Sequence, residues 1–107
     1  MVSQIQPSDL KAILDAGAPV LLLDVREPDE HAVCRLPGSV HIPLGELPSR
    51  ASELDPGESL VVVYCHHGIR SISGAAVLLH AGFPNVASLA GGIERWAVQI
   101  DPTVPRY

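Results

Sequence analysis

Ser59-Leu-Val-Val-Val-Tyr64 leads directly into Cys65-His-His-Gly-Ile-Arg-Ser71, and the organisation of the chain follows from this junction. The first segment is the apolar, β-branched run typical of a strand buried on both faces. Beyond Ser71, apolar residues recur up to Ala81 at the spacing of one helix face, and Gly82 stands where the helix should end. We therefore predict that Cys65 lies at the carboxyl end of a buried strand, where open α/β sheets place their binding sites.

This position predicts a reactive sulfur at Cys65. The unpaired N–H groups of a first helical turn, together with the amides of the preceding turn, favour a negative charge on a thiol held among them. Arg70 adds a permanent positive charge at the rim, and Gly68 permits a backbone turn that a side chain would hinder. The alternative is an inert core residue, because free cysteine is among the most buried residue types.

The bulk composition restricts the class of protein. A chain of 107 residues, 47% of them hydrophobic, is long enough for one domain, to which we assign residues 1–107. A net charge of −5 argues against binding to nucleic acid or to an anionic membrane. The sequence has no run typical of a transmembrane helix or a signal peptide. We therefore expect a cytoplasmic location in which both cysteines remain thiols.

Further elements are predicted from apolar runs and turn residues along the chain. Besides the central strand, strands are expected near Ile5 and at 19–24, 40–42 and 86–89. Helices are expected from a Ser8-Asp9 cap to Gly17, as one turn at 28–32, as two short helices separated by Pro48, and at 93–100. Residues 101–107 contain two prolines and are expected to form an extended tail. This alternation predicts an α/β fold with a mainly parallel central sheet flanked by helices.

Charged residues end the strand expected at 19–24. Side chains alternate along an extended segment, so Asp24 and Arg26 should point the same way. One interpretation is that they lie at the same edge of the sheet as Cys65 and support its loop. The other is that they belong to a solvated turn.

Two histidines follow Cys65 directly. His66 and His67 either line the loop, where a protonated ring would help to hold a thiolate, or face solvent as spectators. Adjacent residues seldom converge on one tetrahedral ion, and the sequence has no Cys-x-x-Cys motif or suitably spaced histidine pair. We therefore expect no metal site.

Four motifs together resemble the rhodanese domain in their order and spacing. They are Asp24-Val-Arg-Glu27, Leu36-Pro-Gly-Ser-Val-His-Ile-Pro43, Cys65-His-His-Gly-Ile-Arg-Ser71 and Leu89-Ala-Gly-Gly-Ile-Glu-Arg-Trp96. The resemblance covers nearly the whole chain and implies a rhodanese-like three-layer fold. In one departure, Cys34-Arg35 stands where many members have Gly-His, so the resemblance implies no histidine role there.

The resemblance implies a single-domain sulfurtransferase in which Cys65 carries sulfane sulfur as a persulfide. Arg70 would bind an anion beside the thiol. The substrate site would be formed by the loop residues His66, His67, Gly68, Ile69 and Ser71. Related cysteine phosphatases have one more residue between Cys and Arg, so this shorter loop suits a single sulfur atom. Phosphatase or arsenate reductase activity is therefore not expected.

Two classes of function follow from these observations. The favoured one is an enzyme that moves sulfur from a small anionic donor such as thiosulfate to a thiophilic acceptor, without a cofactor. Cyanide would serve as the acceptor in vitro, and a low-molecular-weight thiol or an acceptor protein in the cell. The alternative is a regulatory or binding module on the same fold, which would not need an activated thiol. Cys34 is expected to have a structural role or none, and a resolving thiol that receives sulfur from Cys65 is the alternative.

Overall fold

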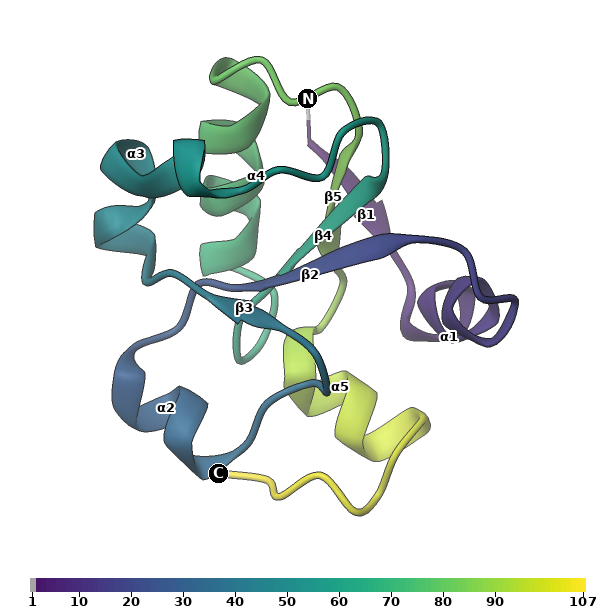
Figure 1. The fold of residues 1–107 in the computed structure, drawn as a ribbon. Coiled ribbons are helices and arrows are strands. Elements are labelled where there is room, and N and C mark those ends of the chain that lie inside the picture. Colours follow the sequence, from purple (N-terminus) through teal and green to yellow (C-terminus); the bar gives the residue numbers. More distant parts are fainter. Residues whose placement is uncertain (1) are drawn as a thin grey trace.

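Five parallel strands form the centre of the computed structural model, which describes residues 2–107 (Figure 1). The strands are β1 (Ser3–Ile5), β2 (Val20–Asp24), β3 (Val40–His41), β4 (Leu60–Tyr64) and β5 (Val86–Leu89). Their order in the sheet is β1-β5-β4-β2-β3, and every neighbouring pair is parallel. The predicted parallel α/β architecture is confirmed, with the strand that precedes Cys65 in the middle.

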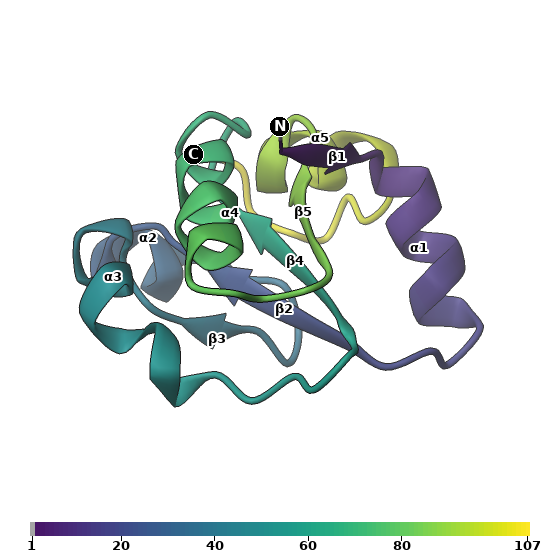
Figure 2. The same ribbon diagram turned by 90° about the horizontal axis from the view of Figure 1, so that it is seen from above.

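Helices cover both faces of this sheet and make a three-layer structure (Figures 1 and 2). They are α1 (Pro7–Asp15), α2 (Pro28–Val33), α3 (Leu47–Arg50), α4 (Arg70–His80) and α5 (Gly92–Gln99). Helices α3 and α4 lie on one face, and α1 and α5 lie on the other. Within residues 2–107, the helices are too short or too polar to cross a membrane.

The core has two parts because side chains alternate along β4. Val61, Val63 and Cys65 pack in the cluster that includes residues of α4, whereas Val62 and Tyr64 pack with residues of α5. The second cluster contains the buried Trp96, as expected for the largest side chain of an aromatic-poor core, and also Cys34. The register pairs Asp24 with Tyr64, so the ends of β2 and β4 lie level.

Some predicted helix boundaries are wrong. Helix α1 is preceded by Gln6 and begins at Pro7, not after a Ser8-Asp9 cap, because proline suits the first helical position. Pro48 does not separate two helices but lies in the first turn of α3, where its missing N–H is not needed. Short 3-10 turns, η1 (Leu44–Glu46) and η2 (Ala51–Glu53), flank α3 instead.

The tail is less extended than predicted. Residues after Asp101 form a turn in which the Val104 amide donates to the Asp101 carbonyl at 3.1 Å, and Val104 is buried. The chain then runs back to α2, beside which Tyr107 lies (Figure 1).

Candidate active site

Cys65 follows the last residue of β4, at the carboxyl edge of the sheet, and is 1% exposed. The level ends of β2 and β4 place the segment Asp24–Arg26 at this same edge. The predicted meeting of these two segments is therefore confirmed by the strand register. In a parallel sheet this edge is the usual place for a binding site.

Donors from the loop and from α4 converge on the Cys65 sulfur. The backbone amide of Gly68 lies 3.2 Å from Sγ and the amide of Ser71 lies 3.4 Å from it. The Cys65 thiol itself donates to the Ser71 hydroxyl oxygen, which is 3.5 Å from Sγ. Ser71 is the second residue of α4, so its amide is one of those that helix geometry leaves without an internal partner. This arrangement stabilises negative charge on the sulfur.

A second serine completes the surroundings of the sulfur. The Ser71 and Ser88 hydroxyl oxygens are 2.7 Å apart, and both residues are fully buried. Ser88 belongs to β5, which lies next to β4 in the sheet. The sequence analysis did not identify this residue, although a serine within an otherwise apolar strand is a signal that could have found it.

The N-terminus of α5 fixes the other side of the loop. The amides of Ile93 and Glu94 donate to the carbonyls of Cys65 and His66, at 2.9 and 3.1 Å. This close approach requires Gly92, which has φ +62°, because a Cβ there would lie 2.5 Å from the Cys65 carbonyl oxygen. The role predicted for Gly68 is confirmed as well, since it has φ +92° and an added Cβ there would lie 2.9 Å from the backbone nitrogen of Gly91.

His66 and His67 do not contact the sulfur through their rings. The two rings stack on each other with centroids 3.9 Å apart, and His66 also stacks on Tyr107 at 3.9 Å. Burial and the neighbouring His67 lower the pKa of His66 below its usual value, so the idea that a protonated ring assists the thiolate is not supported there. Within residues 2–107 no cluster of three or more potential metal ligands is found.

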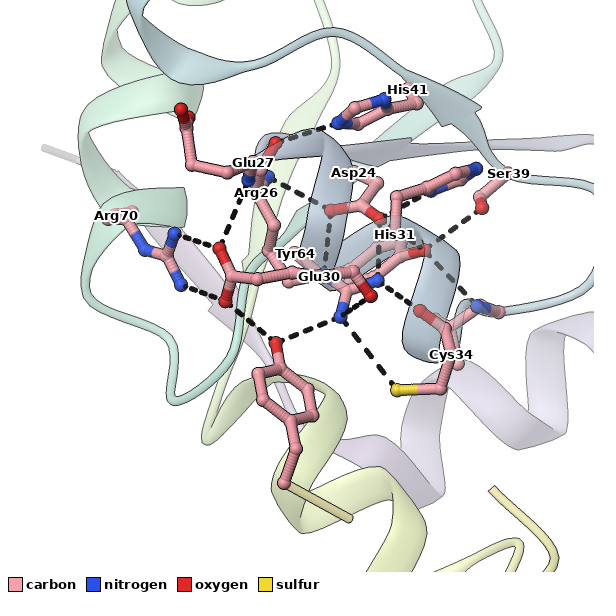
Figure 3. A network of polar contacts seen from close by, with 12 residues as sticks. Asp24, Arg26, Glu27, Glu30, His31, Cys34, Ser39, His41, Tyr64 and Arg70 are labelled. Atoms are coloured by element: carbon pink, nitrogen blue, oxygen red, sulfur yellow. Dashed lines mark hydrogen bonds and ion pairs between the residues drawn. The ribbon is translucent and has the colours of Figure 1, made fainter. Parts of the chain in front are cut away.

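Ile69 and Arg70 continue the loop into α4. Ile69 is 77% exposed and presents an apolar side chain beside the loop. The Arg70 guanidinium forms a two-point ion pair with the Glu30 carboxylate, with N···O distances of 2.6 and 2.9 Å (Figure 3). This pair raises the pKa of Arg70 and lowers that of Glu30 to about 2. Glu30 lies 40 positions before its partner, and no local pattern in the sequence indicates this pair.

Asp24 and Arg26 form a fully buried ion pair behind Glu30 (Figure 3). Burial alone would raise the pKa of Asp24, but hydrogen bonds from Arg26 and His31 outweigh it and lower the value. Arg26 also donates to the carbonyls of Glu30 and Cys34, at 3.2 and 2.5 Å. The loop support predicted for Asp24 and Arg26 is therefore indirect: Arg26 fixes α2, and α2 carries the partner of Arg70.

The other histidines near this edge join the same network. His31 Nδ1 is 2.8 Å from Asp24, and His41 Nε2 is 2.7 Å from the Arg26 carbonyl. The two rings stack with centroids 4.4 Å apart. These half-buried residues hold the end of β2 in place.

Cys34 is buried with its sulfur 3.8 Å from Arg26 Nη1. It packs in the cluster with α5, whereas Cys65 packs in the cluster with α4. This location agrees with a structural role and gives no support to a resolving thiol.

The tail reaches the site through Tyr107. Its hydroxyl accepts from Arg26 Nη1 at 2.9 Å and donates to Glu30 Oε2 at 2.8 Å. Burial raises the pKa of Tyr107 to about 12, so this hydroxyl stays protonated. The preceding Arg106 pairs with Glu94 of α5. Arg106 and Tyr107 therefore bring the tail against the wall of the site.

Comparison with known proteins connects this geometry to a family. The family model for the rhodanese-like domain matches residues 6–99. A sulfurtransferase of Allochromatium vinosum is 38% identical over 91% of this chain and 90% of its own length. The putative sulfur carrier protein YrkF of Bacillus subtilis is 35% identical over 89% of this chain, which spans about half (51%) of that relative.

A solved structure agrees with these sequence matches. The rhodanese-related protein of Thermoplasma volcanium superposes with a TM-score of 0.84 at 30% identity, over 98% of this chain and 99% of its own. The four motifs, the parallel sheet and the sulfur-centred loop all agree with this assignment. The chain belongs to the rhodanese-like domain family.

Proposed function

We propose that this protein is a sulfurtransferase that carries sulfane sulfur as a persulfide on Cys65. The observation that carries the proposal is the convergence of two backbone amides and the Ser71 hydroxyl on the Cys65 sulfur. A merely structural cysteine does not need such a set of donors. Relatives named sulfurtransferase and sulfur carrier support the same activity.

The first step is attack of the Cys65 thiolate on the outer sulfur of the donor. The new S–S bond forms on Cys65 as the donor's S–S bond breaks, and the bonding electron pair leaves with the rest of the donor. That leaving group is sulfite from thiosulfate, or a thiolate from a persulfide. The amides of Gly68 and Ser71, which face Sγ, stabilise the attacking thiolate. After the transfer they can also stabilise the negative charge on the terminal sulfur of the persulfide.

In the second step a thiophilic acceptor attacks the terminal sulfur, and its bond to Cys65 breaks with return of the thiolate. Cyanide gives thiocyanate in vitro, and a thiol gives a new persulfide. The exposed Ile69 offers an apolar contact to an acceptor protein that approaches the loop. A cytoplasmic location fits this chemistry, because a reducing compartment keeps Cys65 as a thiol.

The proposal is tested by incubating the protein with a sulfane-sulfur donor and measuring intact mass without reductant. We expect the mass of one sulfur atom to be added and then removed by cyanide, with thiocyanate formed. A binding module on the same fold would bind partners but would neither gain this mass nor form thiocyanate.

A further inference from the structure

The cation closest in sequence to the reactive loop is already neutralised. Arg70 precedes Ser71, whose amide faces the sulfur. Both terminal nitrogens of its guanidinium are bound to the two oxygens of Glu30, at 2.6 and 2.9 Å. An anionic donor that approached Arg70 would therefore meet a carboxylate in the position its own oxygens would need.

Glu30 is held in this position by more than Arg70 (Figure 3). Its Oε1 accepts the backbone amide of Glu27 at 3.0 Å, as part of a capping box at the start of α2. Its Oε2 accepts the hydroxyl of Tyr107 at 2.8 Å. The side chain is only 16% exposed. A donor anion would have to displace a carboxylate that is anchored from three sides.

Two other arginines near this edge are paired as well, whereas Arg95 of α5, whose side chain lies against Gly91, binds the neutral Gln6. Arg26 binds Asp24 within the buried network, and Arg106 of the tail binds Glu94 of α5. The whole chain carries a net charge of −5. The attraction that a dianion such as thiosulfate would find at Arg70, Arg26 and Arg106 is therefore largely cancelled by neighbouring carboxylates.

We propose that Glu30 is a specificity-determining residue that favours sulfur donors with at most one negative charge, namely small or protein-bound persulfides, over dianionic thiosulfate. The inference rests on the sulfur transfer proposed above and concerns only the choice of donor. A persulfide delivers its outer sulfur by the same exchange and releases a thiolate, so it does not require a free cation for a sulfonate group.

The test compares wild-type protein with Glu30→Gln. Glutamine keeps one oxygen that can still accept the Glu27 amide, while its amide nitrogen replaces the oxygen that accepts the Tyr107 hydroxyl, so the capping box should be retained while the charge is removed. We would measure the second-order rate constant for loading of Cys65 with thiosulfate and with the persulfide of 2-mercaptoethanol, at low and high salt. Glu53→Gln removes the same charge from an exposed pair with Arg50 and serves as the matched control.

We expect Glu30→Gln to accelerate loading from thiosulfate about tenfold, the size of one charge-assisted hydrogen bond at a partly exposed site. That rate should become strongly salt-dependent, while the persulfide rate changes less than about twofold. Glu53→Gln should alter neither rate. Glu30→Asp, which keeps the charge but shortens the side chain, should not accelerate thiosulfate loading.

Two results would overturn the inference while the sulfur transfer itself stands. One is an unchanged or slower thiosulfate rate in Glu30→Gln, with normal persulfide loading. The other is an equal change for both donors, which would mean that Glu30 only maintains the structure. Failure of the wild-type protein to load from either donor would instead overturn the proposed function, and the inference with it.

Discussion

The hydroxyl groups of Ser71 and Ser88 lie 2.7 Å apart, and Ser71 connects this pair to the Cys65 sulfur at 3.5 Å. When the thiol loses its proton, the Ser71 hydroxyl can donate to the sulfur while the Ser88 hydroxyl donates to Ser71. Ser88 of β5 thereby stabilises a negative charge on the Cys65 sulfur indirectly, through Ser71.

Replacement of Ser88 by alanine should slow the loading of Cys65 with sulfur by about three- to tenfold. The reason is that Ser71 loses its donor, and a net hydrogen bond contributes about 0.5–1.5 kcal/mol. Ser73→Ala on α4 removes an exposed hydroxyl and serves as the control. Equal loading rates in the two variants would show that the serine pair does not assist the sulfur.

The two cysteines should behave differently in sulfur loading. We expect Cys65→Ser to lose loading and turnover entirely, because the amides of Gly68 and Ser71 face only this sulfur. Cys34→Ser should keep most of the activity, with the added sulfur located on Cys65 by peptide mass spectrometry. Sulfur found on Cys34, or turnover by Cys65→Ser, would contradict the assignment.

Gly92 and Gly82 provide a matched pair for testing the close packing of the α5 N-terminus against the loop. Both have positive φ, +62° and +95°, but an added Cβ at Gly82 would meet open space. Gly82→Ala should lower the free energy of unfolding by about 1 kcal/mol, the cost of the backbone conformation alone. Gly92→Ala should lower it by about 2–4 kcal/mol, because the Cβ would also collide with the loop carbonyls. Urea unfolding of both variants measures the difference, and similar losses would contradict the steric account.

Acid should weaken the fold partly through Glu30. Its pKa falls from an ordinary 4.5 to about 2 in the folded protein, so its pair with Arg70 stabilises the fold fully above pH 4.5. This contribution disappears as the pH falls from 4.5 towards 2. Allowing for the partial exposure of the pair, we expect it to amount to about 1–2 kcal/mol.

The measurement is the free energy of unfolding at pH 7 and pH 3 for the wild-type protein and Glu30→Gln. The difference between the two proteins should be present at pH 7 and smaller at pH 3. A difference that is independent of pH would show that the ionised carboxylate is not what stabilises the fold.

The central part of the fold was predictable because its signals are local. An unbroken β-branched run followed by a helical period and Gly82 identified β4, α4 and the position of Cys65 between them. The boundary errors at α1 and α3 have a local cause too: each of these helices has a proline in its first turn, whereas the sequence patterns favour a cap at Ser8-Asp9 and a break at Pro48.

The site residues that could not be predicted from the sequence belong to pairs that are far apart along the chain. Glu30 was placed in a single helical turn, and nothing near it in the sequence indicates Arg70, which lies 40 residues later. Ser88 reaches Ser71 across 17 residues, and Tyr107 reaches Arg26 across 81. Such contacts depend on strand order and on the path of the tail, which local periodicity does not determine.

The hydrogen bonds from Ile93 and Glu94 to the carbonyls of Cys65 and His66 couple the length of the loop to the position of α5. An additional residue next to these carbonyls, between Cys65 and His67, would move at least one of them away from its donor. A loop widened at that point, able to surround a tetrahedral oxyanion, must therefore also rebuild the junction between β5 and α5. A change of substrate size on this scaffold requires coordinated changes in two segments more than twenty residues apart.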